Sequence, residues 1–305
     1  MRISRRVSGS LCNDVDVTDT RPPEHHPIAS VVIPAHNEER GIARLLTGLT
    51  SGVEPGEIEI VVVCNGCTDA TADVARDYGN AVTVVELDQP SKRDALRHGD
   101  AEATAYPRLY VDADVELSGE SVKRLSEVLS GGSVLAAAPA RVLPRTGVNP
   151  LVSWYYDVWE ELPQVRSGLF GRGVIALSQE ANERIRALPP MMSDDLVMSE
   201  AFRPAERSIV ESAVVVVRPP KKVRDLLRRR VRSATGNAQA DSEGLRSADA
   251  QTSPRVLVEM MRAKPSLALR MPVFVGLTMA GKIASRRAIK RGDFSTWLRD
   301  ESSRT

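Results

Sequence analysis

The chain has 305 residues, of which 42% are hydrophobic, and its formal net charge is +1. This composition provides enough apolar side chains for a folded core and excludes global disorder. The nearly balanced charge argues against a dedicated nucleic-acid-binding protein, so we expect no nucleic-acid partner.

The three cysteines, Cys12, Cys64 and Cys67, are too few for a disulfide framework. Cys64 and Cys67 form a Cys-x-x-Cys pair, which raises zinc binding and redox chemistry as alternatives. A zinc site needs further ligands at matching spacing, and no second pair follows in the sequence. The sequence therefore disfavours both alternatives.

Residues 1–27 are polar and carry positive charge without a following apolar run, which is unlike a secretory signal. We expect this segment to be a mobile leader. No stretch reaches the roughly 20 apolar residues that a membrane span needs, so we expect a cytoplasmic protein. Met271–Gly281 comes nearest. It fits either a core helix, which its length favours, or a helix that lies on a membrane surface.

Strands and helices alternate through the first half of the chain. The β-branched run Ser30–Ile33 predicts a strand that is covered on both faces and ended by Pro34. The apolar spacing from Ile42 to Leu49 predicts a helix with Asn37 as its cap. Further strands are predicted at 58–63, 81–87, 109–111 and 134–138, with helices at 69–79 and 92–105. A further helix after 109–111 is predicted to bury Val122, Leu125, Val128 and Leu129.

This alternation implies parallel crossover units, in which ligands bind outside the carboxyl ends of the strands. Three polar segments follow strands there: Pro34–Glu38, Cys64–Asp69 and Asp112–Asp114. We expect them to converge on one edge of the sheet. Asp112 and Asp114 are one residue apart, so they are suited to sharing a hard cation such as Mg²⁺ or Mn²⁺.

The alternation weakens after residue 140. Trp154, Tyr155, Tyr156 and Trp159 lie in one predicted helix. Their rings fit either sugar stacking or a core, and the helical spacing favours a core. The elements expected after them are a glycine-rich loop at 168–173, strands at 174–177 and 209–217, a helix beginning at 194, a basic helix at 221–234 and a polar loop at 237–254, followed by helical sequence.

The segments Val31–Glu39 and Val62–Thr71 resemble the opening of the family 2 glycosyltransferases. Further segments match the family in the same order: Ser91-Lys92, Asp112-Ala113-Asp114, Gly171-Arg172-Gly173 and Asp194-Asp195. It implies an α/β fold of the GT-A type, with a mostly parallel nucleotide-binding sheet flanked by helices. It also implies a nucleotide-sugar-binding half at 28–140, an acceptor-binding half at 141–240, and a loop with a C-terminal helical extension at 241–305.

On the donor side, the resemblance implies that Asp114 binds the metal on the donor diphosphate, while Asp112 assists or contacts the ribose. The remaining donor residues that it implies are Pro34, Ala35, Glu38, Asn65, Asp69, Lys92, Arg229 and Arg232. The two arginines fall in a Gln-x-x-Arg-Trp element of the family, with Arg229 at the Gln position and Ser233 in place of the Trp. That replacement weakens any inference to a processive synthase.

On the acceptor side, the resemblance implies that Gly171, Arg172 and Gly173 lie near the acceptor. It also implies that Asp195 is the catalytic base and that Asp194 positions it. An alternative interpretation is structural, because acids at the start of a helix are favoured by the helix dipole.

The resemblance thus implies a metal-dependent, inverting transfer of a hexose from a nucleotide diphosphate sugar to a hydroxyl acceptor. The acceptor would be a sugar or a lipid-linked compound, such as a cell-envelope precursor, and residues 267–287 could then touch the inner face of the membrane. One alternative is a sugar-phosphate nucleotidyltransferase, which the loop Pro34–Glu38 disfavours because it is neither glycine-rich nor basic. The other is a non-catalytic nucleotide-sugar-binding module.

Overall fold

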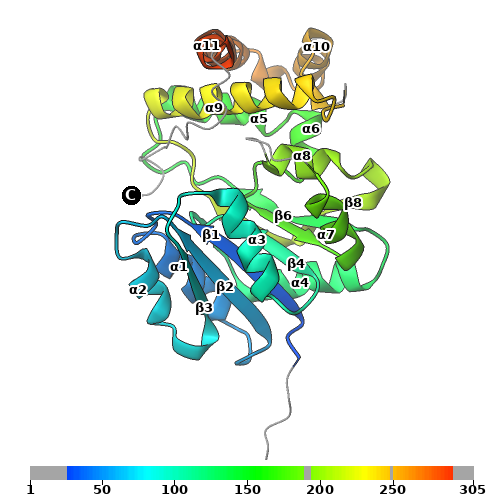
Figure 1. The fold of residues 1–305 in the computed structure, drawn as a ribbon. Helices are drawn as coiled ribbons and strands as arrows, with labels where there is room; N and C mark the ends of the chain where they lie inside the picture. Colours follow the sequence, from blue (N-terminus) through cyan, green and yellow to red (C-terminus); the bar gives the residue numbers. More distant parts are fainter. Residues whose placement is uncertain (1–25, 189–193, 248–249, 291–305) are drawn as a thin grey trace, which may run out of the picture.

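The protein is described here from a computed structural model, which covers residues 26–188, 194–247 and 250–290. The leader expected at 1–27 lies almost entirely outside these residues. An α/β layer forms the lower part of the molecule, and a layer of helices lies above it (Figure 1). Among the described residues, no helix is both long and apolar enough to cross a membrane.

The α/β layer contains one eight-stranded sheet, in the order β3-β2-β1-β4-β7-β6-β8-β5. The strands β3, β2, β1 and β4 are mutually parallel, β7 runs antiparallel between β4 and β6, and β5 pairs antiparallel with β8. Their bounds are β1 Ala29–Ala35, β2 Ile58–Asn65, β3 Thr83–Leu87, β4 Arg108–Val111, β5 Val115–Leu117, β6 Ala136–Val142, β7 Val174–Leu177 and β8 Arg207–Val217. The parallel half thus has the predicted character.

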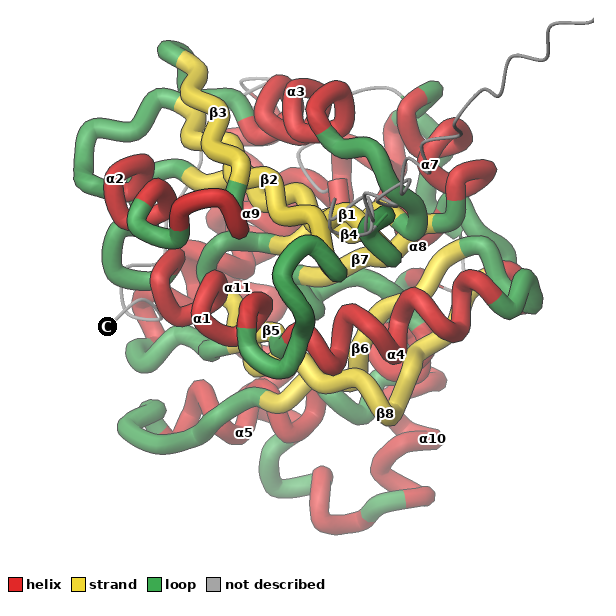
Figure 2. Tube along the Cα trace, turned by 90° about the horizontal axis from the view of Figure 1, so that it is seen from below, coloured by secondary structure: helices red, strands yellow, loops and turns green. Residues whose placement is uncertain are grey.

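Helices cover both faces of this sheet (Figure 2). Helices α3 and α7 pack on one face, and α1, α2 and α4 pack on the other. The bounds of these helices are α1 Ile42–Thr50, α2 Thr71–Arg76, α3 Lys92–Glu102, α4 Gly119–Ser130 and α7 Gln179–Arg186. Short 3-10 helices lie at Gly79–Ala81 (η1), Pro204–Glu206 (η2) and Pro265–Leu267 (η4).

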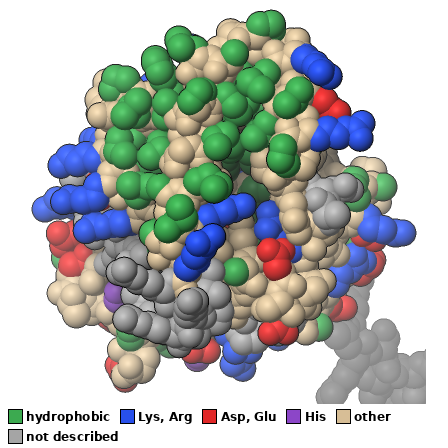
Figure 3. Space-filling view, turned by 90° about the horizontal axis from the view of Figure 1, so that it is seen from above, with side chains coloured by type: hydrophobic (Ala, Val, Ile, Leu, Met, Phe, Trp, Pro, Cys, Tyr) green, Lys and Arg blue, Asp and Glu red, His purple; other side chains and the backbone are tan. Residues whose placement is uncertain are grey.

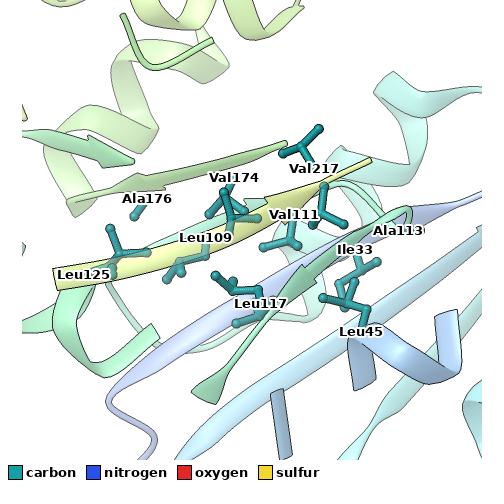
Figure 4. Close-up of a cluster of buried hydrophobic side chains, with 14 of the residues drawn as sticks. Ile33, Leu45, Leu109, Val111, Ala113, Leu117, Leu125, Val174, Ala176 and Val217 are labelled. Carbon is teal, nitrogen blue, oxygen red and sulfur yellow. The ribbon is translucent and has the colours of Figure 1, made fainter. Parts of the chain in front are cut away.

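Burial on both faces explains why the parallel strands are continuous apolar runs. Val31 and Ile33 of β1 belong to the core beneath α1, whereas Val32 belongs to a separate cluster beneath α3. Full burial of such a side chain contributes about 1.5–3 kcal/mol. Figure 4 shows part of the larger core, where β1, α1, β4, β7 and β8 meet through Ile33, Leu45, Leu109, Val174 and Val217.

The upper layer consists of α5 (Pro150–Trp159), α6 (Pro163–Ser167), α9 (Val223–Ser242), α10 (Pro254–Ala263) and α11 (Met271–Lys290). Helix α8 (Asp194–Glu200) lies below it and packs through Met198 against the cluster that β6, β7 and α7 form. Helix α11 packs against both α9 and α5. At Gly281 the two longest helices come so close that a Cβ atom there would lie 2.7 Å from Cβ of Arg230. Tyr155 is buried and stacks on Phe274 with a centroid distance of 5.2 Å, as the core interpretation of the aromatic helix predicts.

Two local predictions were wrong. Asn37 does not cap α1, which begins at Ile42 after Gly41. Asn37 instead has a left-handed backbone (φ 53°), and its Oδ1 accepts a 2.7 Å hydrogen bond from the amide of Thr68, which joins two loops. The loop expected from residue 237 onwards is helical as far as Ser242, because α9 continues beyond its basic segment.

A buried ion pair fixes the start of β4, the strand that leads to Asp112. Nη1 of Arg108 lies 2.6 Å from Oδ1 of Asp100, and both side chains are almost fully buried. Arg108 also donates to the carbonyls of Asp100 and Ala103 near the end of α3. This network holds α3 and β4 together at the end of the strand opposite to the predicted site.

We expect Arg108→Met to lower the free energy of unfolding by about 3–5 kcal/mol, because it leaves the carboxylate of Asp100 buried without this partner. Urea denaturation measures this change. Arg44→Met is the matched control, since it breaks a half-exposed pair with Glu116 and should cost less than about 1 kcal/mol. Equal losses in the two variants would contradict a role for the buried pair.

Candidate active site

A large open cavity of about 1650 Å³ lies between the carboxyl edge of the sheet and the upper helical layer. It brings together residues that are distant in sequence. The predicted site residues that line it are Pro34, Glu38, Asn65, Lys92, Asp112, Asp114, Gly171, Gly173, Asp195, Arg229 and Arg232. Residues from both predicted halves of the chain therefore face one cavity.

The two aspartates at the end of β4 flank Ala113, which is buried, and each is half-buried. Nζ of Lys92 lies 2.9 Å from Oδ1 of Asp112. The carboxylate of Asp114 makes no hydrogen bond or ion pair with any residue that the structure describes. One aspartate is therefore charge-paired, and the other faces the cavity with its oxygens available to a ligand.

Gly173 helps to fix the backbone position of Asp112. Its carbonyl accepts a 2.8 Å hydrogen bond from the amide of Asp112, and its φ of +67° favours glycine. A Cβ atom at this position would lie 2.5 Å from Cγ1 of Val115 and 3.4 Å from Oδ2 of Asp112. A side chain here would therefore displace the turn that carries the carboxylates.

The oxygen donors of this turn fit a hard divalent cation. Within residues 26–188, 194–247 and 250–290, no three His, Cys, Asp or Glu side chains form a metal-binding group, so protein ligands alone do not complete a site. Mg²⁺ typically uses one or two carboxylates and takes its other ligands from water and substrate phosphates. Asp112 and Asp114 provide that set of donors.

Hydrogen bonds tie the loops after β1 and β2 together at the donor side. Nδ2 of Asn65 donates to the carbonyl of Ala35 (2.8 Å), and its Oδ1 accepts from the amide of Ser91 (3.1 Å). His36, which also lines the cavity, contacts the carbonyl of Asn65 through Nδ1 at 2.5 Å. Asn65 therefore uses both ends of its amide to position neighbouring loops.

Two residues predicted on the donor side do not line the cavity. Ala35 is fully buried within β1, and only its carbonyl is engaged by neighbouring side chains. Asp69 accepts hydrogen bonds from the amides of Glu39 (3.2 Å) and Thr71 (3.1 Å), so it fastens the two loops to each other. Both residues support the site from behind.

The prediction that Arg172 meets the acceptor is not supported by its position, which is inside the protein. The side chain is 4% exposed and donates to four carbonyls, those of Gly168, Pro139, Val165 and Arg166. Burial lowers the pKa of its guanidinium to about 10. Its neighbours Gly171 and Gly173 do line the cavity. Arg172 therefore supports the glycine loop from inside.

Asp195 lies in the first turn of α8 and lines a small pocket together with Lys92 and Asp112. Its Oδ2 accepts a 2.9 Å hydrogen bond from the amide of Gly171, and its Oδ1 accepts one from Leu196 (2.8 Å). Gly171 has a φ of +67°, and a Cβ atom there would lie 3.0 Å from the indole of Trp159. The glycine thus lets its amide reach the carboxylate. The side chain of Asp194 lies outside the described part of the structure.

Arg229 and Arg232 lie one turn apart on α9 and both face the cavity. Burial is the main cause that lowers the pKa of Arg232, and Arg229 lowers it further, whereas Asp195, Asp112 and Asp114 raise it. The same guanidinium thus interacts electrostatically with the carboxylates at both sides of the cavity. Nη1 of Arg229 donates to the hydroxyl of Tyr156 at 3.2 Å.

Some cavity residues were not predicted from the sequence. Phe274 and Thr278 of α11 line its upper end, together with Arg230 and Arg246. The basic run on α9 includes Arg230, but only Arg229 and Arg232 were assigned to the site because they fall at the positions of the family's motif. Nothing in the sequence linked α11 to the cavity.

Parts of the chain are similar to known proteins. Residues 30–167 match the model of glycosyl transferase family 2. A 4,4'-diaponeurosporenoate glycosyltransferase from Staphylococcus aureus is 36% identical over 95 residues, which are 30% of this chain and 25% of that protein. Glycosyltransferase AglE from Haloferax volcanii is 29% identical over 35% of this chain and 37% of that protein. The chain thus spans only about a quarter to a third of the length of these relatives.

A mannosyltransferase from Pyrobaculum calidifontis, solved in complex with GDP-Man and Mn²⁺, has a similar fold, with a TM-score of 0.59. The similarity covers 88% of this chain and 78% of that one, at 21% sequence identity. The fold is therefore that of the GT-A glycosyltransferases, as the sequence predicted. Residues 30–167, somewhat less than half of the chain, are similar to glycosyl transferase family 2.

We expect Arg172→Met to lower the free energy of unfolding by at least about 2 kcal/mol, because several buried carbonyls lose their donor. Urea denaturation measures this, with Arg166→Met as the control, since the side chain of Arg166 is largely exposed. A variant as stable as the wild type would contradict this structural role and favour the predicted contact of Arg172 with the acceptor.

Proposed function

We propose that this protein is a metal-dependent, inverting glycosyltransferase that moves a hexose from a nucleotide diphosphate sugar to a hydroxyl acceptor. The observation that carries the proposal is the shared cavity: Asp112 and Asp114 line it from the sheet, and Asp195 lines it from α8. Arg232 interacts electrostatically with all of them. Such a site has a diphosphate side and an acceptor side within one space.

On the donor side, Asp112 and Asp114 would hold the cation, Mg²⁺ or Mn²⁺, which neutralises charge on the leaving diphosphate. The Mn²⁺ in the Pyrobaculum calidifontis complex supports a divalent metal. Lys92, Arg229 and Arg232 add positive charge around the same space. Negative charge develops on the diphosphate as the glycosidic bond breaks, so fixed guanidinium groups stabilise the transition state more than the ground state.

On the acceptor side, Asp195 is the group that we assign as general base. It would take the proton of the acceptor hydroxyl while that oxygen attacks the anomeric carbon and the diphosphate departs from the opposite face. Because the hydroxyl oxygen attacks the face opposite to the departing diphosphate, the configuration of the anomeric carbon is inverted. The amide of Gly171 orients the carboxylate by its hydrogen bond to Oδ2. Asp194, which precedes it, is proposed as a positioning residue.

The predicted halves, 28–140 for the nucleotide sugar and 141–240 for the acceptor, are proposed as a division by ligand rather than by fold. The strand β6 crosses residue 140, and α9 crosses residue 240. We propose that the acceptor is a sugar or a lipid-linked compound, such as a cell-envelope precursor. The place of action would be the cytoplasm or the inner face of the membrane.

Nucleoside diphosphates should raise the melting temperature in the presence of Mn²⁺, because a ligand that binds only the folded state stabilises it. At a concentration 100 times its Kd, such a ligand contributes about 2.7 kcal/mol. We expect Asp114→Asn to remove the Mn²⁺-dependent part of the shift. Asp73→Asn is the control, since this aspartate is exposed on α2. A full shift in Asp114→Asn, or no shift with any nucleotide in the wild type, would contradict the donor site.

We expect Asp195→Asn to reduce the turnover of the donor about 10²–10⁴-fold, because the amide cannot accept the hydroxyl proton. Release of nucleoside diphosphate measures the rate, and nucleotide binding should remain unchanged. Glu120→Gln is the matched control, since Glu120 is an exposed acid in the first turn of α4, away from the cavity. If Asp195→Asn changes only the stability, Asp195 serves the helix and not the reaction. Release of pyrophosphate from a nucleoside triphosphate and a sugar phosphate would favour a nucleotidyltransferase.

A further inference from the structure

The outer surface of the upper helical layer exposes an unusual number of large apolar side chains. Leu269 is 73% exposed, Met279 52% and Ile283 54%, and Val258 and Val275 are exposed as well. Figure 3 shows hydrophobic side chains spread over this face, with lysine and arginine side chains at its borders. We call this surface, formed by α10, η4 and α11, the apolar face.

The apolar face follows from the register of α11. Phe274 and Thr278 point inward and line the cavity, whereas the next residues in the chain, Val275 and Met279, are exposed. With Ile283, the exposed residues recur at every fourth position and form one stripe along the helix. The helix is thus apolar on both sides, and only its inner side has a protein partner among the described residues.

This part of the chain carries an excess of positive charge. Residues 254–290 contain eight lysines and arginines and one acid, Glu259, whereas the whole chain contains 41 basic and 40 acidic residues. Arg262, Lys282 and Arg286 are exposed on the same two helices as the apolar side chains. An exposed apolar stripe with a basic border is typical of helices that lie in the interface of a bilayer.

We propose that the apolar face binds the surface of an anionic lipid bilayer. Lysine and arginine side chains at the border attract anionic headgroups, while the stripe of α11 enters the boundary with the acyl chains. A second copy of the chain fits this face less well, because a twofold contact would bring the two basic borders together.

Docking in this way has a consequence for the acceptor, which rests on the proposed function. Helix α11 has the apolar face on its outer side and lines the cavity with Phe274 and Thr278 on its inner side, so about 10 Å, the diameter of a helix with its side chains, separates the two at this point. The buried Nε of Arg230 has no hydrogen-bond partner there among the described residues. We therefore assign the acceptor to hydroxyl compounds that a membrane lipid carries, with their polar end reaching into the cavity.

Flotation of the full chain with vesicles tests the docking without any need for activity. Vesicles of phosphatidylcholine with one part in three of phosphatidylglycerol should bind the protein, and vesicles of phosphatidylcholine alone should bind it weakly. The variant with both Met279→Glu and Ile283→Glu should lower the bound fraction about tenfold, because it places two charges in the stripe. Ile28→Glu is the matched control, since Ile28 is exposed before β1, away from the upper layer.

Circular dichroism and the nucleotide-dependent melting shift establish that each variant is folded. Equal binding of the double variant and Ile28→Glu would overturn the proposal, and so would the absence of binding to both kinds of vesicle. Sedimentation velocity provides a further test. A dimer in the wild type that the double variant dissociates would show that a second copy covers the face.

Incubation of the protein with a labelled sugar donor and a bacterial lipid extract tests the acceptor class. Label in the organic phase supports a lipid-borne acceptor. Label found only in water-soluble glycans, with vesicle binding intact, would overturn that assignment alone. If no donor turns over with any acceptor, the proposed function itself fails, whereas the flotation result still decides whether the face binds lipid.

Discussion

Mutual repulsion of carboxylates is the constraint around which this site is built. Asp112, Asp114 and Asp195 face one cavity, and their negative charges would oppose folding if no cation lay near them. Lys92 neutralises Asp112 directly, and Arg232 acts on all three from α9. The helical layer is therefore more than a cover, because it contributes the positive charge that lets the carboxylates share the space. The divalent cation and diphosphate that we propose would extend the same balance.

The evidence for the two sides of the cavity differs in kind. The family match ends at residue 167, so it includes Asp112 and Asp114 but not Asp195, Arg229 or Arg232. Assignments on the acceptor side depend instead on geometry, above all on the hydrogen bond from Gly171 to Asp195. The proposed donor residues Asp112 and Asp114 have both the family match and their position in the cavity in their favour, whereas Asp195 has its position alone. Mutants of Asp195 are therefore more informative than mutants of Asp112 or Asp114.

The parallel sheet and its rim were predictable because burial on both faces leaves a clear apolar run, as at Ile58–Val63, and because parallel strands share one carboxyl edge. The direction in which individual side chains point was harder to predict. Arg172 lies between two cavity-lining glycines, yet the left-handed turns at Gly171 and Gly173 direct its side chain into carbonyls beneath. Asp69 has the chemistry of a ligand, but amides nearby use its oxygens. Such outcomes depend on tertiary neighbours, which neither spacing nor residue type specifies.

Gly281 has a mechanical implication. Because this residue has no side chain, α11 lies directly against the backbone and Cβ of Arg230. The two helices are therefore closely packed at this point. Close-packed contacts of this kind transmit displacement rather than absorb it. Arg229 and Arg232, which line the cavity, lie next to Arg230 on the same helix. A displacement of α11 would therefore also move α9, and with it the two guanidinium groups that face the cavity.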